Sequence, residues 1–186
     1  MGQLDVDATL ATSHYLNTLS LASRTKGKKL LMGGSHGGYI SAHLSGRHPE
    51  EYDAVVMRNP VVDLPSMLYA TDIPDWVFAE ALLPYSFDSP PTSLDPETYA
   101  RLHALSPLAN VGNVVVPTLL LVGQDDRRVP PDQSRAWYHA LKALGKGEVD
   151  MLTFPGEGHD LARTVEVEVV GFEAGLRFLE KYTNFQ

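Results

Sequence analysis

Cysteine is absent from this chain of 186 residues. Its absence excludes a disulfide framework and any metal site built from thiolates. It also agrees with a reducing compartment, and we expect a cytoplasmic location. Long apolar runs are missing as well, because no stretch approaches the roughly 20 residues that a membrane span needs.

Positive charge is scarce. The chain has 15 Lys and Arg against 23 Asp and Glu, for a formal net charge of −8. A nucleic-acid-binding surface needs a basic patch, and the basic clusters at 24–29 and 127–128 are short. We therefore expect neither a nucleic-acid nor a membrane partner. The first ten residues hold two aspartates where a signal peptide carries Lys or Arg, and Val6 stands where a myristoylation signal has Ser or Thr.

What the chain does contain is an alternation of short apolar runs and helical patterns. Hydrophobic residues make up 44% of the sequence and charged residues 20%, as in a globular domain. Strands are predicted at 28–32, 54–57, 118–122 and 149–154, and helices at 5–21, 37–48, 132–144 and 163–182. This order predicts the α/β class, with a mostly parallel sheet and helices on both faces.

Residues 61–107 differ from the rest, since they are rich in proline and aromatic residues and carry no strand pattern. We expect a helical insert there. One helix start is predicted at 71–76, with an Asp or Thr cap and an early proline. Another is predicted at Asp95, which would cap a helix with Pro96 in its first turn.

A glycine-rich run, Gly33-Gly34-Ser35-His36-Gly37-Gly38, lies between the first predicted strand and a helix. It contains Gly-x-Ser-x-Gly, the pattern of a nucleophile elbow, in which a strained serine projects its hydroxyl above the sheet. We interpret the glycines as room for that turn. The backbone N–H of His36 then opens the helix and faces a developing oxyanion. Neither His36, which adjoins the serine, nor His43, two turns along the helix, is placed to act as its base.

Two further candidates follow the third and fourth predicted strands. They are the acidic pair Asp125-Asp126 and His159. Ser, Asp and His in this order match the triad of an α/β-hydrolase. The histidine would take the proton of Ser35, and the aspartate would fix the tautomer of the histidine. This chemistry needs neither a metal nor an organic cofactor, and we predict none. Each motif alone has an ordinary alternative, namely a glycine-rich turn, an acidic turn or a surface histidine, and their order on loops after strands favours the triad.

The run 33–38, the segment 126–130 (DRRVP) and the dipeptide 158–159 resemble the prolyl oligopeptidase family of serine peptidases. The segments 57–76 and 123–130 resemble its acylaminoacyl peptidase branch in particular. The resemblance extends over essentially the whole chain. It implies an α/β-hydrolase fold and release of an N-acylated amino acid from short N-acylated peptides.

By position, the resemblance makes Ser35 the nucleophile, Asp126 the orienting carboxylate and His159 the base. Asp126 is preferred to Asp125 because the family pattern is close to Asp-x-Arg-Val-Pro. Arg128 stands where related enzymes bind a substrate carbonyl or carboxylate, and a loop-stabilising ion pair is an equal alternative.

Three residues of the helical insert are candidates for the wall of an acyl or first-residue pocket: Ile73, Trp76 and Val77. Packing inside the insert is at least as good an interpretation of these side chains, and the sequence leaves both open.

The resemblance also implies that this chain differs from the family's enzymes in extent. Enzymes of this family carry an N-terminal β-propeller and a first half of the sheet, including a loop with a second oxyanion donor. We expect residues 1–186 to be the C-terminal part of a catalytic domain only. Two alternatives stay open: a non-catalytic fragment that forms a homo-oligomer or pairs with a fuller-length homologue, and a small esterase or thioesterase.

Overall fold

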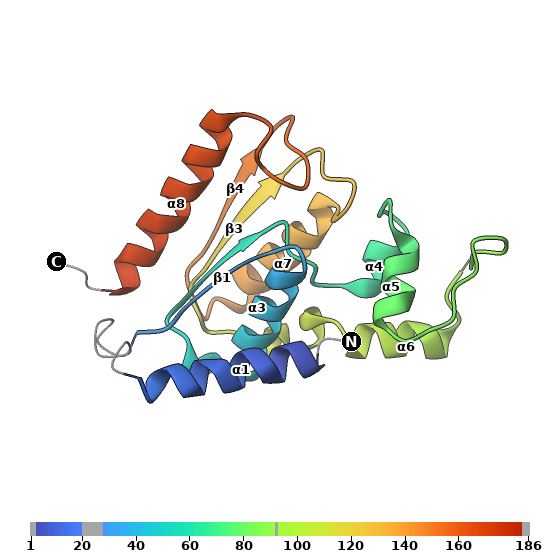
Figure 1. Cartoon of the computed structure of the whole chain (residues 1–186), viewed down its shortest axis with the longest axis horizontal. Helices are drawn as coiled ribbons and strands as arrows, with labels where there is room; N and C mark the ends of the chain where they lie inside the picture. The colour runs from blue at the N-terminus through green and yellow to red at the C-terminus, as the bar shows by residue number, and fades with distance from the viewer. Residues whose placement is uncertain (1–2, 20–27, 92, 184–186) are drawn as a thin grey trace.

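The computed structural model describes residues 3–19, 28–91 and 93–183. Its centre is a four-stranded sheet in the order β1-β2-β3-β4 (Figure 1). The strands are β1 (Leu30–Gly34), β2 (Ala54–Arg58), β3 (Thr118–Gly123) and β4 (Val149–Phe154). All three pairings are parallel, so the predicted α/β class is confirmed.

Helices lie on both faces of the sheet, as predicted. Helices α3 (His36–Arg47) and α7 (Pro131–Leu144) cover one face, and α8 (Val165–Thr183) covers the other (Figure 1). The strand order is sequential, and right-handed crossovers therefore bring the connecting segments to one face. Helix α8 follows the last strand, makes no crossover, and is free to pack on the opposite face.

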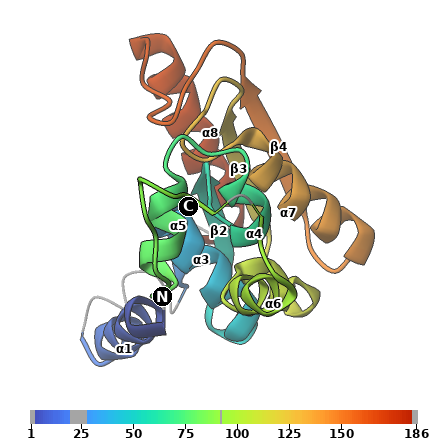
Figure 2. The same ribbon diagram turned by 90° about the vertical axis from the view of Figure 1, so that its right-hand side faces the viewer.

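The remaining helices lie outside these two layers. Helix α1 (Gln3–Asn17) packs on α3. The short helices α4 (Leu64–Leu68), α5 (Pro74–Glu80) and α6 (Pro96–Ala104) lie together on the α3 side (Figures 1 and 2). The described residues also form two 3₁₀ segments, η1 (Pro49–Glu51) and η2 (Pro107–Asn113). No helix in the described part of the chain has the length and apolar character needed to cross a membrane.

The apolar residues of β2 are buried on both faces of the sheet. Val55 and Met57 belong to the cluster under α3 and α7, whereas Ala54 and Val56 belong to the cluster under α8. A strand covered on both faces needs apolar residues at successive positions, which explains the continuous run AVVM.

The first strand lies two residues later than the predicted range 28–32. It extends into the glycine run, because Gly33 pairs with Met57 and Gly34 pairs with Arg58. Glycine has a low strand propensity, so the sequence assigned these two residues to the turn. Pairing with the buried strand β2 outweighs that preference.

Two helix predictions also need correction. Helix α5 begins at Pro74 with Ile73 as its N-cap, and no side chain caps it, so the predicted Asp or Thr cap is wrong. Thr71 instead accepts a hydrogen bond from the Ile73 N–H. In α1, Val6 is buried, but the aromatic side chain of Tyr15 is 63% exposed. Helix α1 ends at Asn17, and residues 18 and 19 form a turn, so the predicted extension of this helix to residue 21 is wrong.

The segment 61–107 packs around a second apolar cluster, to which it contributes residues such as Leu64 and Phe78 and to which Tyr39 of α3 and Val129 also belong. Asp95 caps α6 as predicted, since its carboxylate accepts from the Thr98 N–H at 2.9 Å. The buried side chain of Gln133 in α7 joins this segment to the main domain. Its Oε1 accepts from the N–H groups of residues 62 and 63 at 2.9 and 2.8 Å.

Candidate active site

Ser35 occupies the single residue between β1 and α3. Its φ of 55° and ψ of −119° place a residue with a side chain in a backbone region that costs about 1–3 kcal/mol. Two hydrogen bonds hold this turn: the Ser35 N–H donates to the Arg58 carbonyl at 2.9 Å, and the Ser35 carbonyl accepts from the Tyr39 N–H at 3.0 Å. This is the geometry that a nucleophile elbow requires.

Two of the four neighbouring glycines are required by close packing. A Cβ atom at Gly33 would lie 2.2 Å from the carbonyl oxygen of Gly37, and one at Gly38 would lie 2.7 Å from the Cβ of Pro60. A Cβ at Gly34 would have an ordinary contact at 3.5 Å, and one at Gly37 would meet nothing within 4 Å. The interpretation of the glycines as room for the turn therefore applies to Gly33 and Gly38 only.

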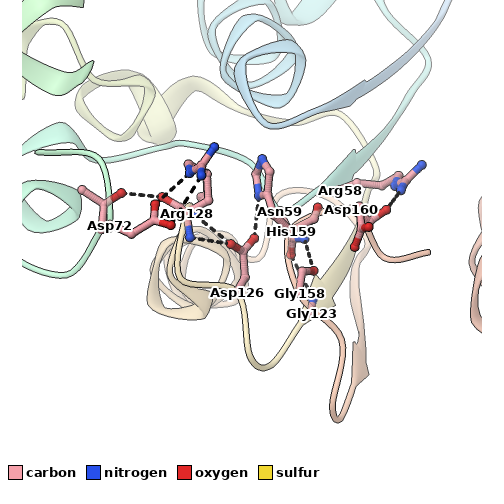
Figure 3. A network of polar contacts seen from close by, with 11 residues as sticks. Arg58, Asn59, Asp72, Gly123, Asp126, Arg128, Gly158, His159 and Asp160 are labelled. Carbon is pink, nitrogen blue, oxygen red and sulfur yellow. Dashed lines mark hydrogen bonds and ion pairs between the residues drawn. The ribbon is translucent and has the colours of Figure 1, made fainter. Parts of the chain in front are cut away.

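Asp126 and His159 lie together at the carboxyl ends of β3 and β4 (Figure 3). The distance between Asp126 Oδ2 and His159 Nδ1 is 2.7 Å. Asp126 Oδ1 accepts from the N–H groups of Arg128 and Val129 at 2.8 and 2.9 Å. A carboxylate only accepts hydrogen bonds, so Nδ1 of the imidazole carries the proton and Nε2 keeps a free lone pair.

The two adjacent aspartates have different surroundings. The Asp126 side chain has no exposed surface, and that of His159 is 31% exposed. Asp125 is exposed, and its backbone N–H donates to the Glu157 carbonyl at 2.9 Å. The structure thus brings the predicted Asp126, and not its neighbour, to the imidazole.

Ser35 lies at the same edge of the sheet as this pair, because all four strands are parallel and their carboxyl ends meet there. Within the described residues, no hydrogen bond joins the Ser35 hydroxyl to the imidazole of His159. Such bonds are often long in unliganded enzymes and shorten when substrate binds. Across residues 3–19, 28–91 and 93–183, no group of three or more acidic or histidine side chains is arranged to hold a metal ion.

His36 opens helix α3, where an α-helix leaves its N–H groups without intrahelical partners. Its backbone N–H is therefore available beside Ser35. The imidazole points elsewhere: its Nε2 lies 3.3 Å from Asp5 Oδ2, and its ring centroid lies 6.1 Å from that of Trp76. The side chain thus links α1 to α5.

Arg128 forms the ion pair that the sequence offered as one alternative. Its Nε donates to Asp72 Oδ1 at 2.7 Å, and its Nη2 lies 3.4 Å from Oδ2 (Figure 3). The hydrogen bond from Arg128 lowers the pKa of Asp72, and the same bond raises the pKa of Arg128. Both side chains are nearly half exposed, at 46% and 44%. This pair connects the loop after β3 to the turn between α4 and α5 in the helical insert.

The three candidate pocket residues of the insert do not share one environment. Val77 has no exposed surface and belongs to the apolar cluster of the insert. Ile73 and Trp76 are half-buried.

Arg58 and Asn59 are site residues that the sequence analysis did not single out. Arg58 is the last residue of β2 and Asn59 follows it, and both donate to the loop that carries His159 (Figure 3). The signal available in the sequence was a polar pair directly after the fully buried run AVVM, at the edge of the sheet where the other candidates gather.

The whole chain, residues 1–186, matches the prolyl oligopeptidase family. It is 45% identical over 152 residues to the acylamino-acid-releasing enzyme of Homo sapiens. The aligned residues make up 82% of this chain and 20% of that enzyme. A Mycobacterium tuberculosis puromycin-hydrolyzing peptidase superposes with a TM-score of 0.82 at 27% identity, over 100% of this chain and 26% of that one. Acylaminoacyl peptidase from Pyrococcus horikoshii superposes with a TM-score of 0.75 at 25% identity, over 94% of this chain and 27% of that one.

These matches confirm the resemblance inferred from the motifs. They also confirm an α/β-hydrolase fold of which the chain holds a part, since it spans about a fifth of the length of the human relative. The chain belongs to the prolyl oligopeptidase family of serine peptidases.

Proposed function

We propose that this chain carries the catalytic centre of a serine peptidase that releases an N-acylated amino acid from short blocked peptides. The observation that carries the proposal is the 2.7 Å contact between buried Asp126 and His159, at the sheet edge where the strained Ser35 also lies. Family membership and the name of the human relative support the substrate class.

In the first half-reaction, the Ser35 hydroxyl attacks the carbonyl carbon of the N-acylated residue, and Nε2 of His159 takes the hydroxyl proton. The imidazolium that forms is stabilised by the carboxylate of Asp126, which also holds the ring in the required tautomer. The negative oxygen of the tetrahedral intermediate accepts from the backbone N–H of His36.

The intermediate then collapses. His159 Nε2 returns its proton to the amine of the leaving peptide, the C–N bond breaks, and an ester forms on Ser35. In the second half-reaction, water gives a proton to His159 and attacks that ester. The N-acylated amino acid leaves, and the serine hydroxyl regains its proton.

For substrate binding, we propose that the half-buried side chains of Ile73 and Trp76 face the acyl group, with Val77 supporting them from the core of the insert. The proposal is supported by the contact of Trp76 with His36, which adjoins the nucleophile. Arg128 is proposed to bind a substrate carbonyl or carboxylate through the guanidinium N–H groups that Asp72 leaves free.

A fluorophosphonate probe tests the nucleophile in the full chain. We expect covalent labelling that Ser35→Ala abolishes and Ser89→Ala, a change at an exposed serine, leaves unchanged. Circular dichroism of each variant checks the fold. Equal labelling of Ser35→Ala, or none of a folded unsubstituted chain, would contradict the proposal.

Substrate class is tested with two chromogenic compounds, acetyl-alanine nitroanilide and a short-chain nitrophenyl ester. We expect a higher kcat/KM for the acetylated amide once the intrinsic reactivity of the two leaving groups is taken into account. Turnover of the ester alone would assign the triad to an esterase instead.

A further inference from the structure

Three consecutive backbone carbonyls of the loop between β4 and α8 accept hydrogen bonds from Arg58, the last residue of β2, and from Asn59, which follows it. The Asn59 carboxamide Nδ2 donates to the carbonyls of Gly158 and His159, at 3.3 and 3.0 Å. The Arg58 guanidinium Nη2 donates to the carbonyl of Asp160. Figure 3 shows both side chains reaching into this loop.

The other end of the same carboxamide binds a different strand. Asn59 Oδ1 accepts from the Gly123 N–H at 2.9 Å, at the last residue of β3. A carboxamide supplies one acceptor and two donors, and this arrangement uses both kinds. Asn59 therefore links the end of β3 to the loop that carries His159.

The backbone of Asn59 is held as firmly as its side chain. The residue is 1% exposed, its N–H donates to the Leu121 carbonyl at 2.9 Å, and its φ is 40°. Asparagine is among the few residues that adopt a positive φ at low cost. The loop itself also contains a strained residue, Leu161 with a φ of 50°, and a strained conformation persists only where its surroundings hold it.

His159 is thus held from two directions. Its ring is bound by Asp126 at the end of β3, and its backbone carbonyl is bound by Asn59 at the end of β2. We infer that Asn59, together with Arg58, is a positioning residue for the catalytic base, because it holds the backbone of the His159 loop at the place where the ring meets Asp126. The inference rests on the proposed function for the role of His159.

Two substitutions of Asn59 test the role of its carboxamide separately from that of its backbone conformation. Asn59→Asp keeps the shape and the acceptor for the Gly123 N–H, but it removes both donors to the loop. Asn59→Gly accommodates the positive φ and removes every side-chain contact. Asn113→Asp is the matched control, since it adds the same charge at an exposed residue before β3, away from the carboxyl ends of the strands.

The first readout does not depend on activity. We expect the NMR signal of the Nδ1 proton between His159 and Asp126 to move or broaden in both Asn59 variants and to stay unchanged in Asn113→Asp. Fluorophosphonate labelling of Ser35 should slow by about 10- to 100-fold in both, as for a catalytic group displaced by a fraction of an ångström. If the unsubstituted chain does not label at all, the proposed function fails, and the proton signal still decides the role of Asn59.

An unchanged Nδ1 proton signal in folded Asn59→Asp and Asn59→Gly would overturn the inference. If neither variant folds, the unsubstituted chain decides. We expect nuclear Overhauser contacts from the Asn59 carboxamide protons to the backbone protons of residues 158 and 159, and slow exchange of those carboxamide protons with solvent. Rapid exchange and missing contacts would overturn the inference as well.

Discussion

Asp125 and Asp126 are adjacent and chemically identical, yet they have opposite surroundings. The carboxylate of Asp126 is fully buried and accepts from two backbone N–H groups and one imidazole. A buried charge is tolerated only where such donors satisfy it. Asp125 is exposed, and only its backbone takes part in the turn.

This contrast predicts the effect of removing each charge. Asp126→Asn should lower the rate of Ser35 labelling by about 10⁴-fold, because an amide stabilises the wrong tautomer of the imidazole and no longer balances its positive charge. Asp125→Asn should change the rate by less than about twofold, as expected for an exposed group with no contact to the imidazole. The measurement is the second-order rate constant with a fluorophosphonate at neutral pH. Equal rates for the two variants would show that Asp126 has no part in the reaction.

At the level of elements, α3 serves both the site and the helical insert. Its first turn follows Ser35, and its third turn buries His43 against the insert. The ring centroid of His43 lies 4.4 Å from that of Tyr39, and Nε2 of His43 lies 3.1 Å from the Leu105 carbonyl oxygen. Burial, with a smaller effect from the charge of Arg47, lowers the pKa of His43 to about 4.

A lowered histidine pKa makes stability depend on pH in a known direction. In the unfolded chain His43 binds a proton near pH 6.5, whereas in the folded chain it stays neutral down to about pH 4. The contribution of the neutral His43 ring to the free energy of unfolding is therefore fully present above about pH 6.5. It is lost as the pH falls toward 4, at up to about 1.4 kcal/mol per pH unit. Urea unfolding at several pH values should show this slope in the unsubstituted chain.

The matched variant is His43→Gln, which keeps a donor for the Leu105 carbonyl and does not titrate. We expect a smaller loss of the free energy of unfolding between neutral pH and pH 5, whatever its stability at neutral pH. The same slope in His43→Gln and in the unsubstituted chain would assign the pH dependence to other groups.

On the scale of the whole molecule, the α8 face of the sheet is only partly covered. A groove of about 620 Å³ lies between α8 and the sheet, with lining residues from all four strands, and it is lined mainly by apolar side chains such as Met32, Phe172 and Leu176. These three are 53%, 63% and 46% exposed. In the described part of the chain, β1 pairs with β2 alone, so its other edge presents backbone groups without strand partners. Exposed apolar surface beside an open sheet edge favours association.

We therefore predict that the chain self-associates at high concentration through this face. Phe172→Ser should weaken association by roughly tenfold, the effect of losing about 1.5 kcal/mol of apolar burial. Phe87→Ser is the control, since Phe87 is 78% exposed but does not line the groove. Sedimentation velocity over a range of concentrations measures the effect. A monomer at every concentration, or equal weakening by both variants, would contradict this prediction.

Predictions from the sequence were accurate where residues close together in the chain determine the feature. The strand at 149–154 was predicted with its observed bounds, because an apolar run and its turn residues define it within a few positions. The cap at Asp95 was predicted because its acceptor and donor are three residues apart. The first strand was misplaced by two residues, because its extent depends on pairing with a strand more than twenty residues away.

The candidate triad could be read from sequence for a similar reason. In a parallel sheet the residues after each strand gather at one edge, so strand prediction alone brings Ser35, Asp126 and His159 to the same side of the molecule. Asn59 could not be assigned a role in this way. Its partners are 64 to 100 residues away in the chain, and no sequence pattern identifies the backbone carbonyls that accept its hydrogen bonds.

The sequence by itself determined the α/β class, the family and the three candidate catalytic residues, since these follow from hydrophobic spacing and short motifs. Only the tertiary structure decided which aspartate is buried beside the imidazole, which glycines are sterically required, and that Asn59 and Arg58 hold the loop of His159. Each of these depends on contacts between segments far apart in the chain. Such contacts arise from the packing of strands and loops in space, which residue order alone does not specify.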